Sequence, residues 1–255
     1  IHVRLVKLPM KEQDNQHYVI DYMGYCPICE KEVRFRSKTQ RFRRDLICPS
    51  CPNGSKPRER ALILTLNTFC RDWHMSRIHE SSPMDRGASV ILREKCNSYT
   101  STHFFPGRLE GEICNGVRNE NLERQTFPSE SFDIVVSLDV MEHVNRPSLV
   151  FKEVARTLKP GGKYIFTAPT YKQLERSLRR AIIHDDDEIE HLIEPPEYHG
   201  NPIDPKGSLV TFHYGYDLPL LIKQWSNLDV TVLRFQDYHH GIIGEFTEVY
   251  VCVRR

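Results

Sequence analysis

Two pairs of cysteines have a spacing that could hold a metal ion. Each pair has the form CxxC, and residues 30–47 separate the pairs, which is within the roughly 15–20 residues typical of zinc sites. The four thiols belong to Cys26, Cys29, Cys48 and Cys51. Two residues between cysteines let one tight turn present both sulfur atoms to one ion, and two such turns complete a tetrahedral site. We therefore predict a structural zinc ion with four thiolate ligands and no open position for chemistry.

Disulfides and a redox-active CxxC pair are the alternatives for these thiols. The chain begins without an apolar signal segment, so we expect a cytoplasmic protein whose thiols stay reduced. A redox motif would need only one pair at the start of a helix. The remaining cysteines lie in apolar or strand-like surroundings and are expected to be small core residues: Cys70, Cys96, Cys114 and Cys252.

The spacer between the cysteine pairs holds the one basic cluster of the chain. Its apolar positions Val33, Phe35, Phe42 and Leu46 alternate well enough to predict a two-stranded ribbon. The cations between them are Arg34, Arg36, Lys38, Arg41, Arg43 and Arg44. Such a cluster fits a patch for nucleic acid or an anionic substrate, but it fits a solvated face of a small ribbon equally well.

Composition describes a protein with one sizeable core and a small satellite domain. The chain has 255 residues, of which 39% are hydrophobic and 27% charged, and its net charge is +1. A charge so close to zero gives no general attraction to nucleic acid or membranes. No apolar run approaches the roughly 20 residues of a membrane span. The turn-forming stretch at residues 52–57 predicts a boundary between an N-terminal arm with the zinc ribbon, residues 1–57, and a main domain, residues 58–255.

The main domain alternates between strand and helix patterns, which predicts an α/β fold with a doubly wound, mostly parallel sheet of seven strands. Strands are predicted at Arg77–Glu80, Ser98–Thr102, Phe132–Leu138, Lys163–Ala168, Val230–Phe235 and Glu248–Val253. Helices are predicted at residues 57–73, Gly87–Lys95, Pro147–Leu158, Tyr171–Ile183 and Leu218–Gln224. Residues 236–247 are too few for a helical crossover, so we expect the last strand to be antiparallel.

A block in the middle of the main domain carries a family resemblance. It reads FPSESFDIVVSLDVMEHVNRPSLVFKEVARTLKPGGKYIFTAPT, with Phe132-Asp133, Glu142-His143-Val144 and Leu158–Gly162 at its key positions. This block closely resembles the central block of class I S-adenosylmethionine-dependent methyltransferases, and the resemblance extends from about Ser76 to Arg255. The whole chain resembles a subfamily with an N-terminal zinc ribbon. The resemblance implies a Rossmann-like domain that binds S-adenosylmethionine.

The resemblance also implies which residues hold the cofactor. Glu80 stands where the family has an acidic residue at the end of the first strand. Ser81, Ser82 and Pro83 replace the usual glycine-rich turn, and Gly87 follows it. His103 stands near the end of the second strand, where the family has an acid that binds the ribose. Glu120, Asn121 and Leu122 correspond to the segment that contacts adenine, and Leu138 ends the fourth strand, where open α/β sheets bind ligands.

Catalytic and substrate residues are expected beyond the fourth strand and in an insertion. Asp139 and His143 follow that strand, and His143 is the candidate base for the acceptor's proton. Residues 171–214 correspond to a substrate lid in the family. The candidates there and in the last loop are Tyr198, His199, His213, Tyr214 and His239. These histidines could hold a second metal, although they show no tight ligand spacing. The acidic run at residues 184–190 is expected to be a solvated helix end.

These observations predict a methyltransferase that moves a methyl group to an oxygen or nitrogen atom of a small molecule or glycan sugar. An RNA methyltransferase that uses the basic zinc ribbon is a second hypothesis, disfavoured by the neutral charge and the acidic lid. A catalytically silent zinc-ribbon interaction protein is the third, because the cofactor turn lacks its usual glycines. No membrane partner is expected.

Overall fold

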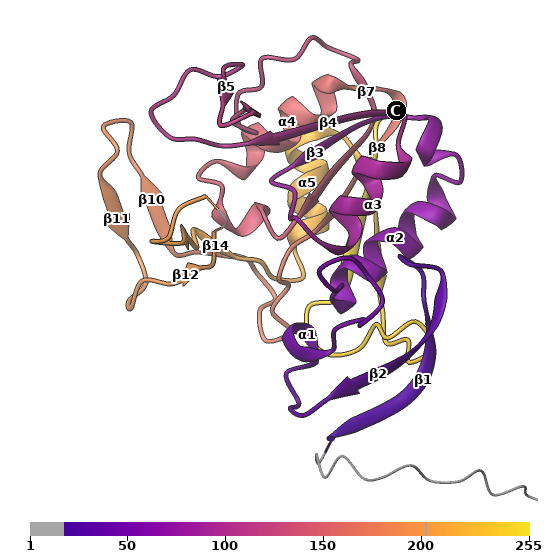
Figure 1. The fold of residues 1–255 in the computed structure, drawn as a ribbon. Helices are drawn as coiled ribbons and strands as arrows, with labels where there is room; N and C mark the ends of the chain where they lie inside the picture. The colour runs from indigo at the N-terminus through magenta and orange to yellow at the C-terminus, as the bar shows by residue number, and fades with distance from the viewer. Residues whose placement is uncertain (1–17, 202) are drawn as a thin grey trace, which may run out of the picture.

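The computed structural model of the protein describes residues 18–201 and 203–255, and one eight-stranded sheet is its largest unit (Figure 1). The first part of the predicted N-terminal arm, residues 1–17, lies outside the described residues. In sheet order the strands are β15 (Asp229–Arg234), β16 (Glu248–Val253), β8 (Leu158–Thr167), β7 (Phe132–Leu138), β3 (Arg77–Ser81), β4 (Ser98–His103), β6 (Val117–Asn119) and β5 (Ile113–Cys114).

The pairing confirms the predicted doubly wound sheet. The neighbours β8, β7, β3, β4 and β6 are parallel, whereas β16 is antiparallel to both β8 and β15. The sheet has eight strands rather than seven, and two of them lie outside the six predicted ranges: β6, and the two-residue β5 that pairs antiparallel with it at the edge. Two residues are too few to show a strand period in the sequence. The central β7 is apolar at nearly every position because helices cover both faces of the sheet.

Two hydrophobic cores cover opposite faces of the sheet, since successive strand residues point to opposite sides. Ile134 and Val136 of β7 belong to the core formed with α2 (Pro57–Phe69) and α3 (Gly87–Lys95). Val135 belongs to the core formed with α4 (Pro147–Thr157) and α5 (Leu218–Ser226). Among the described residues, no helix combines the length and apolarity that crossing a membrane requires.

The zinc ribbon differs from its prediction. Its two antiparallel strands are β1 (Ile20–Cys26) and β2 (Lys31–Ser37), so the first cysteine pair lies at the hairpin turn and one strand precedes it. The predicted second strand, in the later half of the spacer, is instead the short helix α1 (Phe42–Asp45). Phe42 and Leu46 are four residues apart, a spacing that suits one face of a helical turn better than alternate positions of a strand.

The ribbon and the main domain share one hydrophobic core. Phe35, Leu46 and the buried cysteines pack in the same cluster as residues of α2 and the sheet. The fully buried Arg60 of α2 ties three segments together, because its guanidinium donates to the carbonyls of Ser55 at 2.5 Å, Leu46 at 2.9 Å and Gly241 at 2.6 Å. The ribbon is therefore packed against both α2 and the β15–β16 loop.

The predicted helix at residues 171–183 is wrong. That segment forms turns followed by β9 (Leu178–Arg179) and β10 (Ala181–Ile183). The insertion is built from three short antiparallel ladders: β9 with β14 (Phe212–His213), β10 with β11 (Ile189–His191), and β12 (Tyr198–His199) with β13 (Ser208–Leu209). The acidic run lies at the tip of the β10–β11 hairpin rather than at a helix end. The β-branched pair Ile182 and Ile183 favours this extended conformation.

Candidate active site

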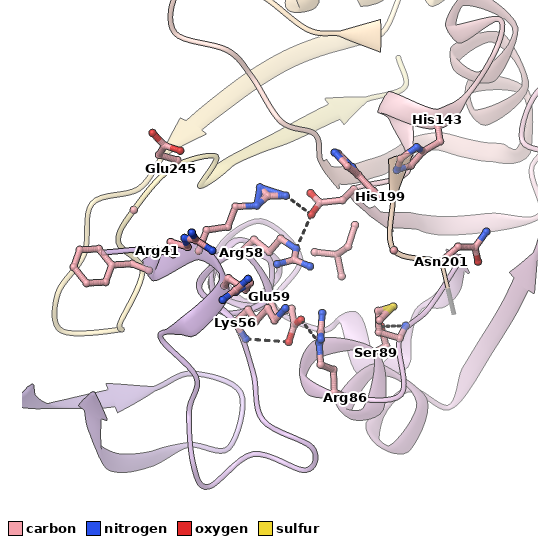
Figure 2. Close-up of a pocket in the computed structure, with 18 of the residues that line it drawn as sticks. Arg41, Lys56, Arg58, Glu59, Arg86, Ser89, His143, His199, Asn201 and Glu245 are labelled. Atoms are coloured by element: carbon pink, nitrogen blue, oxygen red, sulfur yellow. Dashed lines mark hydrogen bonds and ion pairs between the residues drawn. The ribbon is translucent and has the colours of Figure 1, made fainter. Parts of the chain in front are cut away.

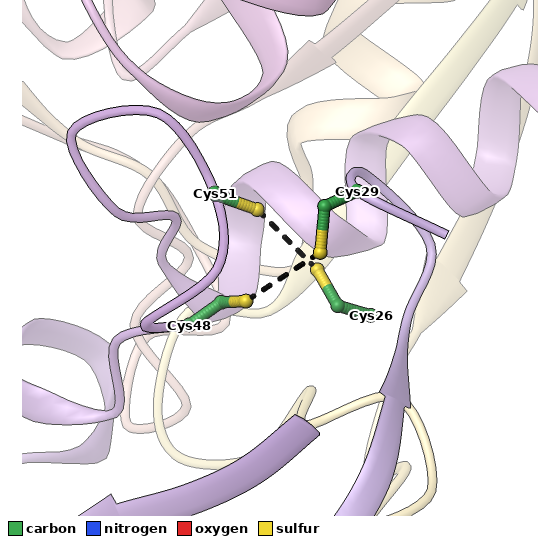
Figure 3. A group of neighbouring side chains, drawn as sticks. All are labelled: Cys26, Cys29, Cys48 and Cys51. Atoms are coloured by element: carbon green, nitrogen blue, oxygen red, sulfur yellow. Dashed lines mark hydrogen bonds between the residues drawn. The ribbon is translucent and has the colours of Figure 1, made fainter. Parts of the chain in front are cut away.

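The four cysteines of the ribbon converge on one point (Figure 3). All four Sγ atoms lie within 4.8 Å of one another; the Sγ atoms of Cys26 and Cys51 are 3.5 Å apart, and those of Cys29 and Cys48 are 3.8 Å apart. Thiolates that share one zinc ion at about 2.3 Å in a tetrahedron lie about 3.8 Å apart, whereas a disulfide would bring two sulfur atoms to about 2.05 Å. The geometry fits a metal site and not disulfides.

The turn after β3 explains how serines replace glycine in the expected cofactor loop. Ser82 adopts the left-handed conformation that a glycine normally supplies, with φ of 56°, and its N–H donates to the carbonyl of Thr102 at 2.7 Å. A left-handed residue with a side chain costs roughly 1–2 kcal/mol, which this bond helps to offset. The chain therefore keeps the shape of the turn without its glycine.

Glu80 is buried next to this turn and does not line either of the two cavities described below. Its carboxylate is buried and accepts hydrogen bonds from Ser89 of α3 at 2.5 Å and from Tyr99 of β4 at 2.8 Å. Burial raises the pKa of Glu80 to about 7, although both hydrogen bonds act in the opposite direction. Glu80 therefore braces the first strand against α3 and β4, and any effect on a cofactor would pass through the turn.

Gly87 and Pro83 also lie outside the linings of both cavities described below. Gly87 begins α3 with φ of 50°, and a Cβ there would stand 1.9 Å from the carboxylate of Glu59 in α2. That close approach lets Glu59 pair with Arg86 at 2.8 Å. Gly87 therefore lets the start of α3 pack closely against α2.

A cavity of about 810 Å³ opens at the carboxyl ends of β3, β4 and β7, and we call it the sheet-edge cavity. Open α/β sheets bind ligands at this edge. The predicted cofactor residues that line it are Ser81, Ser82, His103, Glu120, Asn121, Leu122 and Leu138. Within this set, Glu120 is already engaged, because it pairs with Arg118 at 2.8 Å and accepts a bond from the Thr126 backbone at 2.9 Å. Burial lowers the pKa of His103, which keeps its imidazole neutral.

A second cavity of about 1040 Å³ lies between the ribbon, α2 and the insertion, and we call it the basic cavity. Its cations are Arg41, Arg43, Arg44, Lys56, Arg58 and Arg86. Its carboxylates are Glu59, Asp139 and Glu245. Figure 2 shows Arg41, Lys56 and Arg58 on the side opposite His143 and His199. Burial, followed by the neighbouring arginines, lowers the pKa of Lys56 to about 8.

Leu138, Asp139 and His143 line both cavities, so the two meet at the end of β7. Asp139 is clamped there by two arginines from the N-terminal part of the chain: Arg43 of α1 at 2.5 Å and Arg58 of α2 at 2.7 Å. Burial alone would raise the pKa of Asp139, but the two guanidiniums lower it to about 2. A carboxylate with so low a pKa is a poor proton acceptor at neutral pH, so its geometry favours a positioning role.

His143 is oriented by the insertion. It ends the short helix η2 (Met141–His143), and its Nδ1 lies 2.8 Å from the carbonyl of Leu209. A carbonyl oxygen can only accept, so Nδ1 carries the proton and Nε2 of the neutral ring is left with a free electron pair. This tautomer suits either a general base or a metal ligand.

The substrate candidates of the insertion and of the β15–β16 loop divide into two groups, of which only the first lines a cavity. Tyr198 and His199 line the basic cavity. His213 stands behind them and is bound to Glu197 at 2.7 Å, while Tyr214 is fully buried and donates to the Met141 carbonyl at 2.8 Å. His239 lies away from both cavities and stacks on Tyr25 of the ribbon, with ring centroids 6.3 Å apart.

Three residues of this region were not among the predicted site residues: Arg43 and Arg58 as partners of Asp139, and Glu142. Arg43 was visible only as part of the basic cluster, and Arg58 lies outside it. Glu142 stands beside His143 in the recognised block, yet its burial and its neighbours depend on the insertion, which no local pattern predicts.

Comparison with known proteins agrees with this geometry. A family model described as a methyltransferase domain matches residues 91–166. A ubiquinone biosynthesis O-methyltransferase of Maricaulis maris is 34% identical over 147 residues, which are 56% of this chain and 53% of that protein. One of the same name from Idiomarina loihiensis is 49% identical over 37 residues, 14% of this chain and 15% of that protein. The chain thus spans about half the length of the first relative and far less of the second.

A solved structure of an S-adenosylmethionine-dependent methyltransferase from Mesorhizobium loti is 17% identical, with a TM-score of 0.48, and the match covers 76% of this chain and 98% of that one. The matched family model, the motifs after β7 and the sheet with its antiparallel last strand agree with one another. Residues 91–166 thus match a methyltransferase domain, and the sheet around them has the strand order and the antiparallel last strand expected from the resemblance to class I S-adenosylmethionine-dependent methyltransferases.

Proposed function

We propose that this protein transfers a methyl group from S-adenosylmethionine to an oxygen or nitrogen atom of a small molecule or glycan sugar that carries a negative charge. The observation that carries the proposal is the meeting of two cavities at Leu138, Asp139 and His143. One cavity lies where class I domains hold their cofactor, and the other offers room for an acceptor. Direct methyl transfer needs the donor and the acceptor to be bound next to each other, which two adjoining cavities allow.

The sheet-edge cavity supports the cofactor half of the proposal. When bound, S-adenosylmethionine supplies a methyl group on a positively charged sulfur. Ser81 and Ser82 would bring backbone and hydroxyl groups to the amino acid part, and His103 would bond the ribose as a neutral imidazole. Asn121 and Leu122 offer a polar and an apolar contact for adenine. Glu80, Pro83 and Gly87 would support the turn from behind.

The basic cavity supports an anionic acceptor. Its lining has more cations than carboxylates, and the lowered pKa of Lys56 reflects burial beside other cations. An anion placed among these groups would relieve their repulsion and form charge-assisted hydrogen bonds. Phosphate and carboxylate groups both meet this description. The two relatives are O-methyltransferases, which favours oxygen as the acceptor atom.

His143 is our candidate for the residue that promotes loss of the acceptor's proton. Its Nε2 has the free electron pair, and the residue lines both cavities. Asp139 would hold Arg43 of α1 and Arg58 of α2 beside it. Tyr198 and His199 would contact the acceptor from the insertion.

The arrangement of the arginines favours this reading over an RNA methyltransferase. Arg34 and Arg36 on the outer face of the ribbon both pair with Asp21. The other arginines of the cluster line a cavity that the insertion helps to wall. Phosphate backbones are bound by open basic surfaces rather than by such a pocket.

An acceptor panel tests the proposal. S-adenosylhomocysteine is expected to raise the melting temperature of the protein, because it binds only the folded state. Methyl transfer, followed by mass spectrometry, is expected for hydroxylated small molecules and sugars that carry phosphate or carboxylate, and not for their uncharged counterparts. Arg41→Gln should raise KM for the anionic acceptor with little change in kcat, whereas Arg36→Gln on the outer face should change neither.

Three outcomes of this panel would overturn the proposal. Equal transfer to uncharged acceptors would remove the anionic specificity. Transfer to RNA that weakens steeply with salt would favour the RNA reading. No effect of S-adenosylhomocysteine on melting would favour a silent interaction protein.

We further propose that the four-cysteine cluster holds one structural zinc ion. Cys48→Ser is expected to lower the zinc content from about one per chain and to lower the melting temperature, because the ligated turns belong to the core shared with α2. Elemental analysis and a thiol titration measure this. Cys70→Ser, outside the cluster, is the control and should keep the full zinc content. Metal-free protein with freely titrating thiols would contradict the assignment.

A further inference from the structure

Three side chains beside the basic cavity form a second cluster of metal-ligating type: Glu142, His143 and His199. One carboxylate oxygen and two ring nitrogens lie within 4.8 Å of one another. The Oε1 atom of Glu142 is 3.9 Å from Nε2 of His143 and 3.7 Å from Nδ1 of His199. The cluster joins η2 to strand β12 of the insertion, and Figure 2 shows the two imidazoles close together.

The hydrogen bonds around the cluster leave all three groups as acceptors. His143 donates from Nδ1 to the Leu209 carbonyl at 2.8 Å, so its Nε2 is free. His199 lies 3.1 Å from the carboxylate of Glu197 through Nε2, which must donate, so in the neutral ring its Nδ1 is free. Outer partners of this kind, a carbonyl on one histidine and a carboxylate on the other, orient metal-bound histidines in proteins.

Glu142 supplies an independent indication that a cation belongs here. The residue is 1% exposed, and neither oxygen of its carboxylate has a hydrogen-bond partner among the described residues. A buried carboxylate without donors is costly unless a cation or a proton neutralises it. Its nearest cationic candidate in the described chain is the ring of His199, which stands too far away for a hydrogen bond.

We propose that Glu142, His143 and His199 bind a divalent transition-metal ion, as a second metal site separate from the four cysteines. Two imidazoles and one carboxylate suit manganese, iron or zinc ions and leave coordination positions open. Ligands about 2.1 Å from one ion lie roughly 3–3.5 Å apart, so small side-chain rotations would close the cluster. The open positions would face the basic cavity, which His143 and His199 line.

The role of this ion in methyl transfer rests on the proposed function, but its binding does not. An acceptor oxygen bound to the ion would have a lowered pKa. His143 would then act on the acceptor through the ion rather than as a free base, because its Nε2 would be a ligand.

Manganese binding to the zinc-loaded protein tests the site without cofactor or acceptor. Mn²⁺ prefers oxygen and imidazole to thiolate ligands, so it should leave the cysteine cluster unchanged. Electron paramagnetic resonance of free Mn²⁺ during a titration is expected to show about one bound ion per chain. Glu142→Gln and His199→Ala are each expected to weaken binding at least tenfold. Glu245→Gln, a carboxylate of the same cavity outside the cluster, should bind as the unaltered protein does.

The His199→Ala variant keeps the proposal testable if Glu142→Gln does not fold. Glu142 is buried, so its variant is checked by thermal unfolding, whereas His199 is only partly buried on a short strand. Wild-type protein that binds no Mn²⁺, or that binds it no more tightly than His199→Ala, would overturn the proposal. A loss of binding in Asp186→Asn, at the acidic hairpin tip, with Glu142→Gln unaffected would also overturn it, since the ion would then belong to that tip. A failed acceptor panel with intact Mn²⁺ binding would contradict only the proposed function.

Discussion

Replacing His143 by alanine is expected to lower turnover by roughly 10²–10⁴-fold while the affinity for S-adenosylhomocysteine stays near its original value. The imidazole lines both cavities and presents a free Nε2 at their junction. Its removal would take away the group that we propose promotes loss of the acceptor's proton, either directly or through a bound ion. Steady-state kinetics with the acceptor identified by the panel, together with calorimetry of S-adenosylhomocysteine, measures both quantities.

The control for this prediction is His213→Ala. His213 is bound to Glu197 behind the cavity wall and does not line either cavity. Its replacement should raise KM through a loosened insertion and leave turnover largely intact. If His213→Ala loses turnover while His143→Ala remains active, the proton-accepting group lies in the insertion. If His143→Ala loses cofactor affinity and turnover together, the residue braces the loop after β7 instead.

Replacing Asp139 by asparagine is expected to lower the free energy of unfolding by about 3–5 kcal/mol at neutral pH, because Arg43 and Arg58 would be left as unpaired, largely buried charges. The pKa of Asp139 is lowered to about 2 in the folded protein, against about 3.9 in an unfolded chain. The ion pairs therefore stabilise the fold fully above about pH 4, and this contribution is lost as the pH falls through about 2.

Urea unfolding between pH 2 and pH 7 checks this expectation. The difference between wild type and Asp139→Asn should be largest at neutral pH and shrink in the acid range. Asp45→Asn in α1 is the matched control, because its carboxylate pairs with the exposed Arg44 and its loss should have little effect. An Asp139→Asn protein as stable as wild type at pH 7 would mean that solvent satisfies the two arginines.

The sequence predicts the sheet well because its strands and helices carry their own periodicity. Phe132–Leu138 and Glu248–Val253 are strands with the predicted bounds, and Gly87–Lys95 is a helix with the predicted bounds. The predicted cofactor residues that line the sheet-edge cavity do so because they follow strand ends, and parallel strands end at one edge. The prediction of helices and strands fails in the ribbon and the insertion, because their elements are too short to show a repeated hydrophobic period.

The contacts around the basic cavity could not be predicted, for a different reason. Asp139 meets Arg43 and Arg58, and Glu142 meets His199, only after distant segments have packed together. No local pattern encodes such pairs, and a single sequence offers no other signal for them. The serine turn is an intermediate case: the absent glycine was visible, but only the backbone shows that Ser82 adopts the left-handed conformation in its place.

The ribbon does more than bring the four cysteines together, because α1 and its N-cap contribute Arg41, Arg43 and Arg44 to the wall of the basic cavity. No ribbon residue that the structure describes lines the sheet-edge cavity, so in the proposed function the ribbon would contribute to the acceptor's surroundings and not to the cofactor's. If the basic cavity holds the acceptor, substitutions in the stretch between the two cysteine pairs are expected to alter which molecule is methylated without disturbing the residues that line the sheet-edge cavity. If the proposed function holds, the ribbon would act as an interchangeable selector, and diversification of substrate preference is expected to concentrate within it.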